Sequence, residues 1–347
     1  MPTVMSPDPL IVRPYATQDD VRLLALLRAV WSHKRDIEKH VEDRWWRQWD
    51  EPPLYVVEDP DQGTLVGVCA GIPFALRTNG MELPSAWFVD FYVRPDYQGK
   101  GLGKRLTQAV QDRHAVTASL SQTAMAYRVF QKLGWSDRSP VTLYVHPLAR
   151  RWMFRSASSQ HRIVTAAFDG SLPVWLDVDA LWVRVRNAFP AIAVRSSASL
   201  LARYAARGDR QYVLVGAYRG HELAGYMIVR VVEALSSNAR PPQGLIVDYL
   251  VHPDDTDAFG ALLSEAASML VARGVNRIYA ISTVPACQRV LRARGFLSPS
   301  TPLLGRWITG NTKWFTFVAK PGVLSPLPGD WHLTLGDCDL DYAWVRG

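Results

Sequence analysis

Residues 93–104 read Val93-Arg94-Pro95-Asp96-Tyr97-Gln98-Gly99-Lys100-Gly101-Leu102-Gly103-Lys104. The apolar run at 86–93 predicts a strand that Pro95 ends, and the pattern after Gly101 predicts a helix to about His114. Glycines at such a junction permit positive φ angles and a close approach of backbone to a ligand. The N–H groups of the loop and of the helix start then point at one place, which suits pyrophosphate. We therefore predict a phosphate-binding loop; the alternative is a glycine-rich turn without a ligand.

The sequence around this strand recurs about 158 residues later in the chain. Val89–Asp96 reads VDFYVRPD, and Val247–Asp254 reads VDYLVHPD. Two further pairs of segments match in the same order, 65–67 with 223–225 and 133–135 with 294–296. Self-similarity with a nearly constant spacing indicates two copies of one structural unit. The alternative is two unrelated domains that share common strand chemistry.

The predicted elements of the first copy give a mixed α+β pattern with one helical crossover after the central strand. Strands are expected at 10–15, 54–58, 65–74, 86–93, 116–120 and 141–146, and helices at 17–31, 37–49, 101–114 and 123–133. In the second copy we expect the matching strands at 213–218, 223–232 and 244–251, and a strand near the end of that domain at 312–319. The expected domains are 8–146 and 173–320, with a linker at 147–172 and a tail at 321–347.

Length and composition fit two compact domains in a reducing compartment. The chain has 347 residues, of which 48% are hydrophobic and 20% charged, and its net charge of +7 suits an anionic ligand. Three cysteines, none in a C-x-x-C pair, cannot form a complete disulfide framework. We see no secretory signal, no membrane span and no metal-ligand spacing. A cytoplasmic protein is the expectation.

Residues 93–103 resemble motif A of the GCN5-related N-acetyltransferases (the GNAT superfamily), whose Gln/Arg-x-x-Gly-x-Gly/Ala pattern is met by Gln98, Gly101 and Gly103. The segment 126–135 resembles motif B of that superfamily, which typically ends in a Gly and an aromatic residue. The resemblance covers about residues 8–146 strongly and 173–297 weakly. It implies a tandem GNAT-like fold with a degenerate second domain, and acetyl-CoA as the acyl donor.

In this superfamily two central strands splay apart and the acyl donor enters between them. The resemblance implies that the pantetheine arm pairs with backbone after Asp90 and that the pyrophosphate rests on the glycine loop. The expected donor-binding residues are Phe91, Tyr92, Val93, Gln98, Gly99, Lys100, Gly101, Leu102, Gly103, Lys104 and Phe130. The acceptor amine then attacks the thioester directly, without an acyl-enzyme.

Direct attack needs a base, because an amine is mostly protonated at neutral pH. Asp90 lies on an apolar strand beside the expected thioester, so it is our candidate base or amine-orienting group; the alternative is a structural aspartate, since Asp248 occupies the same place in the second copy. The superfamily often has a tyrosine as general acid where this chain has Phe130. Tyr127, one turn earlier on the same helix face, is the candidate substitute, and otherwise belongs to the core.

The second copy lacks the glycine pattern, because Gln98, Gly101 and Gly103 correspond to Thr256, Phe259 and Ala261. We expect Phe259 to block the backbone approach and the aspartates at 254, 255 and 257 to repel a pyrophosphate. Aspartates also alternate in the tail at 337, 339 and 341, where a solvated edge is expected over a site for an amine or cation.

The sequence thus predicts an N-acetyltransferase that acts on a primary amine of a small molecule, an amino sugar or a peptide. One alternative is an acyl-CoA-binding regulator without turnover. Another is an aminoacyl-tRNA-dependent transferase, related to the peptidoglycan aminoacyl transferases, although the intact glycine loop makes a nucleic-acid partner the weaker expectation. The sequence leaves the acceptor, the acyl chain length and the oligomeric state open.

Overall fold

The computed structural model describes residues 10–30, 53–120, 122–138, 141–147, 160–204, 211–232, 242–301, 317–321, 330–338 and 340. The chain divides into two compact units. Unit 1 comprises residues 1–74, 83–137 and 318–326, and unit 2 comprises residues 75–82, 138–317 and 327–347. The predicted helix at 37–49 and residues 148–159 of the predicted linker lie outside the described residues. Residues 162–168, which we placed in the linker, instead form a strand of the unit 2 sheet.

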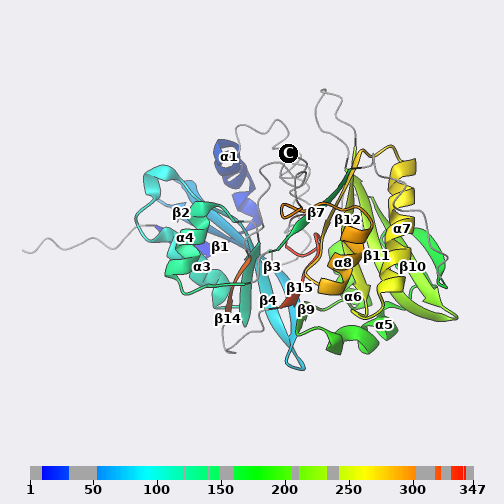
Figure 1. The fold of residues 1–347 in the computed structure, drawn as a ribbon. Coiled ribbons are helices and arrows are strands. Elements are labelled where there is room, and N and C mark those ends of the chain that lie inside the picture. The colour runs from blue at the N-terminus through cyan, green and yellow to red at the C-terminus, as the bar shows by residue number, and fades with distance from the viewer. Residues whose placement is uncertain are drawn as a thin grey trace, which may run out of the picture. The chain divides into compact units, whose positions relative to one another are not determined.

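Unit 1 is built on a mixed sheet with helices packed against it (Figure 1). Its strands are β1 (Ile11–Pro14), β2 (Leu54–Asp59), β3 (Thr64–Thr78), β4 (Met81–Val93), β5 (Val116–Leu120), β6 (Ser136–Asp137) and β14 (Phe317–Pro321), of which the β3–β4 hairpin tip at 75–82 belongs to unit 2. Its helices are α1 (Asp20–Val30), α3 (Leu102–Gln111) and α4 (Ala124–Lys132), with short 3₁₀ turns at Thr17–Asp19 and Pro95–Tyr97. The strand order β1-β2-β3-β4-β5-β14-β6 places β4 and β5 side by side and parallel, joined by α3.

The helix α3 packs through one apolar face. Leu102, Leu106 and Val110 recur every four residues and are fully buried, whereas most of the opposite face is exposed. This face contacts β1, β2 and β5. The packing fixes the start of α3, and with it the glycine loop, against the sheet.

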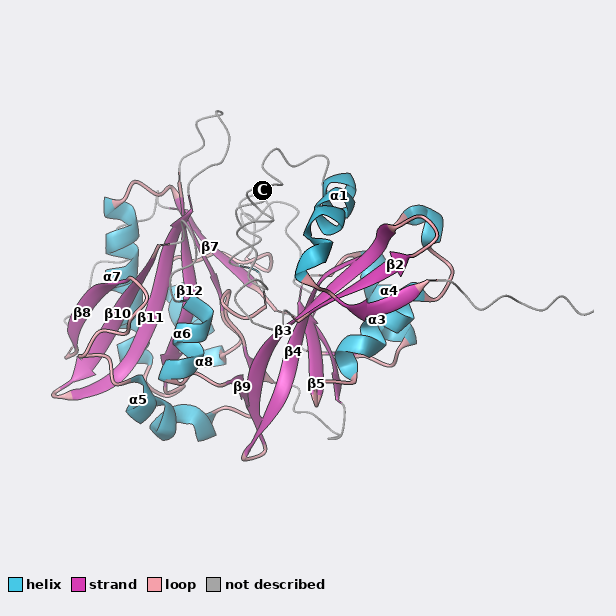
Figure 2. Ribbon diagram, turned by 180° about the vertical axis from the view of Figure 1, so that it is seen from behind, coloured by secondary structure: helices cyan, strands magenta, loops and turns pink. Residues whose placement is uncertain are grey.

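Unit 2 repeats the same order of elements around a six-stranded sheet (Figure 2). Its sheet strands are β7 (Leu143–Pro147), β8 (Arg162–Phe168), β10 (Tyr212–Arg219), β11 (Glu222–Val232), β12 (Gln243–Val251) and β13 (Arg277–Ile281). Its helices are α5 (Val178–Val185), α6 (Ser197–Tyr204), α7 (Thr256–Ala272) and α8 (Pro285–Ala293), with a 3₁₀ turn at Arg186–Ala188, and the short strands β9 (Ala191–Ala193) and β15 (Trp331–His332) pair with each other. The parallel pair β12–β13, joined by α7, is the counterpart of β4–β5.

The repeat read from the sequence is confirmed at single-residue detail. A β-bulge skips Val66 in the β2–β3 pairing, and a bulge skips Ala224, its counterpart 158 residues later, in the β10–β11 pairing. A Cβ on Gly67 would lie 3.2 Å from the carbonyl oxygen of Tyr92, and one on Gly225 would lie 2.9 Å from that of Leu250. Both copies therefore bring the same two backbone segments close together at the same place.

One predicted strand is assigned to the wrong sheet. We expected 141–146 to close the first copy, but β7 pairs antiparallel with β13 in the sheet of unit 2. The strand β14, which follows the second copy in sequence, instead lies between β5 and β6 in the first sheet. Each copy thus takes its last strand from the other. The sequence does not predict this exchange, because the alternation of apolar residues in a strand does not specify which sheet the strand joins.

Candidate acyl-donor site

The predicted phosphate loop has the backbone conformation that its glycines allow. Gly99 and Gly101 have φ angles of +82° and +76°, in the left-handed region that favours glycine. Nothing lies within 4 Å of the Cβ position at either residue, so the loop faces open space. Gly101 is the N-cap of α3, and the first helical hydrogen bond runs from the Arg105 N–H to the Gly101 carbonyl oxygen at 3.2 Å. The N–H groups of the first turn before Arg105 are those that a helix leaves without intrahelical partners, so they can bind an anion.

Tyr97 attaches the loop to the end of β2. Its hydroxyl donates a 2.6 Å hydrogen bond to Asp59, at the end of β2, and Tyr97 is buried. The same carboxylate accepts the N–H groups of residues 61 and 62. The hydrogen bond from Tyr97 lowers the pKa of Asp59, and the carboxylate in turn raises the pKa of Tyr97. The Lys100 amino group lies 4.8 Å from the centre of the Tyr97 ring, which positions a cation beside the loop.

Sequence reasoning missed this Asp59–Tyr97 pair. In the sequence, Asp59 directly follows the strand predicted at 54–58, and Tyr97 belongs to the loop motif. The two residues are 38 positions apart, so no local spacing connects them. A polar aromatic residue directly before a glycine loop was the available signal, since a buried tyrosine hydroxyl normally needs a partner.

Other predicted loop residues have structural contacts of their own. Gln98 donates its side-chain N–H to the Val93 carbonyl oxygen at 3.0 Å, which closes the turn between β4 and the loop. Arg105 donates to the Leu10 carbonyl oxygen at 2.8 Å, so its guanidinium is partly committed to β1. A Cβ on Gly103 would lie 3.1 Å from the ring of Phe91, so a larger residue there would press on that ring. Lys104 is exposed on the first turn of α3.

Asp90 lies on β4, beyond the last residue of that strand that pairs with β5. The parallel register of β4 and β5 ends at Trp87, opposite Ala118. Asp90 is half-buried and has a φ angle of +53°, which is unusual for any residue other than glycine and is less rare for aspartate. Backbone strain of this kind is found at functional sites more often than elsewhere. The predicted donor-binding residues at 91–93 follow directly and are half-buried.

An aromatic cluster lies beneath this part of β4. Phe88, Phe130 and Trp135 are almost completely buried, and the ring of Phe91 packs against those of Phe88 and Phe130 at 5.3 and 5.9 Å between centres. Phe130 stacks on Trp135 at 4.4 Å. The residue that replaces the superfamily's tyrosine therefore belongs to the core that supports Phe91.

Tyr127, the candidate general acid, is hydrogen-bonded to a carboxylate. Its hydroxyl contacts both oxygens of Asp137 at 2.8 and 3.0 Å, and Gln131 donates to the same carboxylate at 3.2 Å. This hydrogen bond raises the pKa of Tyr127. A phenol held in this way releases its proton less readily than a free one, which makes Tyr127 a weaker acid in this arrangement.

In unit 2 a helix replaces the glycine loop. The helix α7 begins at Thr256, the counterpart of Gln98, whereas α3 begins only after Gly101. The side chain of Asp255 accepts the Ala258 N–H at 3.1 Å and so caps the free end of the helix. Unit 2 has therefore converted the loop into an additional turn of helix.

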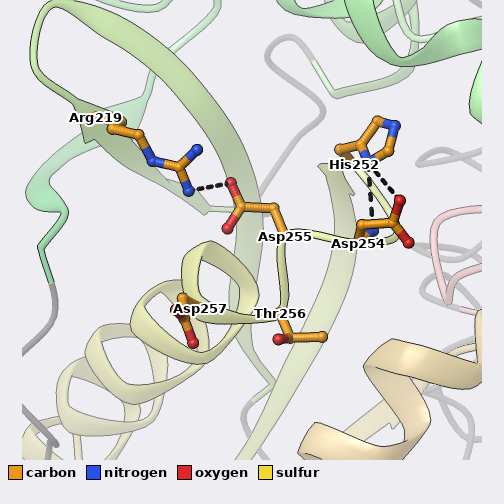
Figure 3. Close-up of a pocket in the computed structure, with 6 residues that line it drawn as sticks. All are labelled: Arg219, His252, Asp254, Asp255, Thr256 and Asp257. Atoms are coloured by element: carbon orange, nitrogen blue, oxygen red, sulfur yellow. Dashed lines mark hydrogen bonds and ion pairs between the residues drawn. The ribbon is translucent and has the colours of Figure 1, made fainter.

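Phe259 has a different role from the one we predicted. It does not stand in the way of a ligand; it is buried, with its ring 4.9 Å from that of Tyr249. The aspartates at 254, 255 and 257, which we expected to repel a pyrophosphate, lie together at the start of α7. A hollow of about 340 Å³ at the start of α7 is lined by Arg219, His252, Asp254, Asp255, Thr256 and Asp257 (Figure 3). Its arginine is paired with Asp255 at 2.9 Å, so the arrangement does not favour a pyrophosphate.

Asp248 and Asp337 are buried together, and both form ion pairs with Arg195. Asp248, the counterpart of Asp90, is 1% exposed and forms an ion pair with Arg195 at 3.0 Å. Asp337, which we expected at a solvated edge, is also buried and pairs with Arg195 at 2.9 Å. That expectation was wrong because the tail folds inward. The other two aspartates of the tail, Asp339 and Asp341, lie outside the described residues.

Within the described ranges, no three His, Cys, Asp or Glu residues are grouped so that they hold a metal ion. No helix in the described part of the chain is long and apolar enough to cross a membrane.

Comparisons with known protein structures identify the fold. A GCN5-related N-acetyltransferase from Anabaena variabilis is similar to 90% of this chain over 72% of its own length, with a TM-score of 0.63 and 13% identity. A tandem GNAT protein from the clavulanic acid biosynthesis pathway is similar over 91% of this chain and 100% of its own, with a TM-score of 0.56 and 18% identity. Saccharomyces cerevisiae N-myristoyltransferase with bound myristoyl-CoA covers 94% of this chain and 87% of its own, with a TM-score of 0.54 and 12% identity. The chain therefore has a tandem GNAT fold.

The sequence itself matches the family model of the acetyltransferase (GNAT) domain at residues 12–137. No curated protein matches the chain by sequence. The chain thus carries a GNAT acetyltransferase domain in its first half, and its enzyme class is acyltransferase.

Proposed function

We propose that the chain is an N-acetyltransferase that transfers an acetyl group from acetyl-CoA to the primary amine of a small molecule, an amino sugar or a peptide. The observation that carries this proposal is the loop between β4 and α3. It combines two left-handed glycines, open space in front of them and the start of a helix held by the Tyr97–Asp59 hydrogen bond. That arrangement suits a pyrophosphate. Lys100 and Lys104 add positive charge close by.

The strand β4 supplies the rest of the donor site in this proposal. Residues 91–93 lie beyond the part of β4 that pairs with β5, and the pantetheine arm lies along their backbone in this proposal, while the Val93 carbonyl oxygen also accepts the Gln98 side chain. The aromatic cluster holds Phe91 in place beneath this strand. When bound, acetyl-CoA presents a thioester, which an amine attacks directly with release of the thiol.

Asp90 is the proposed base or amine-orienting group. The amine must lose a proton to attack, and a carboxylate at the end of the paired part of β4 is close to the donor in this arrangement. The left-handed backbone conformation of Asp90 also supports this role, because backbone strain of this kind is concentrated at functional sites. Asp248, its counterpart, is instead tied to Arg195, so the same residue serves structure in unit 2 and chemistry in unit 1.

A second candidate function is an acyl-CoA-binding regulator without turnover. Two observations favour it: Phe130 has no proton to give, and the Tyr127 hydroxyl is held by Asp137. An aminoacyl-tRNA-dependent transferase is less well supported, since the open glycine loop suits a CoA pyrophosphate without any further partner.

The experiment that separates these functions measures release of free thiol. The purified chain is incubated with acetyl-CoA and a panel of primary amines: polyamines, amino sugars, amino acids and peptides with free N-termini. An acetyltransferase releases thiol with at least one amine faster than with none. A chain that binds acetyl-CoA but shows no amine-dependent release across the panel is the regulator. A chain that does not bind acetyl-CoA contradicts both.

A further inference from the structure

The central strands of unit 2 part in the same way as those of unit 1. The parallel pairing of β12 with β13 runs from Gln243 to Ile246, and β12 continues to Val251. Beyond Ile246 the ladder between these two strands has ended, as it has beyond Trp87 in β4. A wedge therefore opens between Val247–Val251 on one side and the residues after β13 on the other.

The chain's own tail lies in this wedge and bonds to the β12 side. The Gly336 N–H donates to the Val247 carbonyl oxygen at 2.6 Å. The Nε2 atom of His332 lies 3.1 Å from the Tyr249 carbonyl oxygen, within hydrogen-bond distance. Backbone groups that β13 does not pair are thus satisfied by the tail.

The other side of the wedge is closed by Thr283, which follows β13. Its hydroxyl donates to the Trp331 carbonyl oxygen and accepts the Leu333 N–H at 2.9 Å. Trp331 and His332 also form the parallel pair of β15 with β9. The tail therefore contacts both walls, as an added strand does in peptide recognition.

A buried ion network locks the segment. Arg195 lies between Asp248 of the wedge and Asp337 of the tail, at 3.0 and 2.9 Å. The Thr334 hydroxyl donates to Asp248 at 3.1 Å, and the Thr334 N–H donates to Asp337 at 2.9 Å. All three charged side chains are at most 6% exposed, so removing the tail would take one carboxylate from Arg195 and the Thr334 hydroxyl from Asp248, and would leave these buried groups with unmade hydrogen bonds.

The fit of the tail is close. Every residue from Trp331 to Cys338 is buried. A Cβ on Gly336 would lie 2.0 Å from the Tyr204 hydroxyl and 3.1 Å from the Val247 carbonyl oxygen, so only glycine fits at this position. The segment is thus held as a bound ligand is held, by backbone pairing, a buried charge and shape.

We propose that unit 2 is a peptide-binding module, in which the wedge between β12 and β13 is the cleft and residues 330–338 of the same chain are its resident ligand. Val247 and Tyr249 are the counterparts of Val89 and Phe91, so the tail lies in unit 2 at the place that corresponds to the candidate donor site of unit 1. The position of the tail explains why the second copy keeps its splayed strands although a turn of α7 has replaced the phosphate loop. The proposal rests on contacts within unit 2 and is independent of the proposed acetyl transfer.

The test uses the full chain and its Gly336→Leu variant, in which the added side chain meets Tyr204 and should displace the tail. Gly260→Ala is the matched control, because a Cβ at that buried helical glycine meets nothing closer than 3.7 Å. Amide hydrogen exchange is followed at residues 244–251 and 331–338. A synthetic peptide with the sequence of residues 330–340 is then titrated into each protein.

In the wild type and the control, we expect the amides of Leu333 and Gly336 to exchange at least ~100-fold slower than in the free peptide, and the added peptide not to bind. In Gly336→Leu, the same region should lose at least ~10-fold of its protection, and the peptide should bind one to one and restore the protection of 247–251. The amides of the β10–β11 ladder should keep the same protection in all three proteins, which shows that unit 2 of the variant is folded and keeps this test apart from the proposed function.

Three results would overturn the proposal. The first is a wild-type tail whose amides exchange as fast as those of the free peptide, a result that needs no variant. The second is a variant whose tail stays protected, since the close fit at Gly336 would then not exist. The third is a displaced tail with no binding of the added peptide, which would make the segment ordinary core and not a ligand.

Discussion

The hydroxyl of Tyr97 donates a 2.6 Å hydrogen bond to the carboxylate of Asp59, and so joins the glycine loop to the end of β2. Asp59 also holds the turn after β2 through two backbone N–H groups. The loop that we propose for the pyrophosphate is therefore attached to the sheet at its first residue. A loop that is already in place loses less conformational freedom on binding, which improves affinity.

Tyr97→Phe removes this attachment without changing the ring beside Lys100. We expect acetyl-CoA to bind about 5-fold more weakly, because one hydrogen bond that orders the loop is lost while the charge of the loop is kept. Calorimetric titration of the two proteins measures the difference. Tyr218→Phe is a suitable control, because it removes a phenol hydroxyl from β10 of unit 2, which has no part in the proposed donor site. Equal affinities for wild type and Tyr97→Phe would show that the loop does not depend on Asp59.

Asp90 has a φ angle of +53°, and this predicts an unusual order of stabilities. Asp90→Ala and Asp90→Gly both remove the carboxylate, so both should lose amine-dependent thiol release. Alanine in a strand is normally more stable than glycine, but the left-handed conformation costs alanine about 1 kcal/mol more. We therefore expect Asp90→Gly to unfold at a higher denaturant concentration than Asp90→Ala. The usual order, with alanine the more stable, would contradict the conformation of Asp90, and full activity in either variant would remove it from the chemistry.

Tyr127→Phe tests the candidate general acid. A residue that acts as a general acid contributes about 10²- to 10⁴-fold to the rate. Because the Tyr127 hydroxyl donates to Asp137 and its pKa is raised by that carboxylate, we expect kcat to fall by less than about 10-fold. Steady-state thiol release gives the value. A fall of 100-fold or more with unchanged KM would establish Tyr127 as the acid after all.

His332 makes the stability of unit 2 depend on pH. Burial is the main cause that lowers the pKa of His332 to about 4, and Arg195 adds to it, while Asp337 opposes it. An unfolded histidine has a pKa near 6.5, so the unfolded chain binds the extra proton between these two values. The free energy of unfolding should therefore fall as the pH falls from about 6.5 to about 4, by ~3 kcal/mol from this residue alone.

The neighbouring Asp248 acts in the opposite direction, because its pKa is raised, chiefly by burial. The effect of His332 is isolated by comparing the wild type with His332→Gln, whose amide N–H can donate to the same Tyr249 carbonyl oxygen. Denaturant unfolding from pH 7 to pH 4 should show that the wild type loses stability relative to the variant. Parallel curves would mean that His332 is not buried as described.

The parts of this fold that the sequence predicts well are those set by neighbouring residues. Gly99 and Gly101 follow a strand and precede an amphipathic helix, and both have the positive φ angles expected of them. The strand at 116–120 and the helix that Thr123 caps agree closely with β5 and α4. The repeat was visible because both copies keep the close approach of Gly67 and Gly225 to the neighbouring strand.

The parts that could not be predicted depend on pairings between distant segments. The strand β7 has the apolar pattern of any sheet strand, and nothing in that pattern directs it to β13 in place of β5. Asp337 looked like part of an exposed acidic tail, because its partner Arg195 is 142 residues away. Asp59 and Tyr97 each had a simpler local explanation. In each case the role of the residue depends on burial against segments that are distant in the sequence.

The central claim is that the chain has one acyl-donor site, formed by the loop before α3. It is tested most directly by calorimetric titration with acetyl-CoA of the wild type, of Gly101→Asp and of Gly80→Asp. Gly80 is the control because it also has a positive φ angle, +79°, and open space at its Cβ, but lies in the β3–β4 turn. We predict one site per chain in the wild type and in Gly80→Asp, and at least ~100-fold weaker binding in Gly101→Asp, where a carboxylate would face the pyrophosphate. Unchanged binding by Gly101→Asp, or two sites per chain in the wild type, would contradict the account.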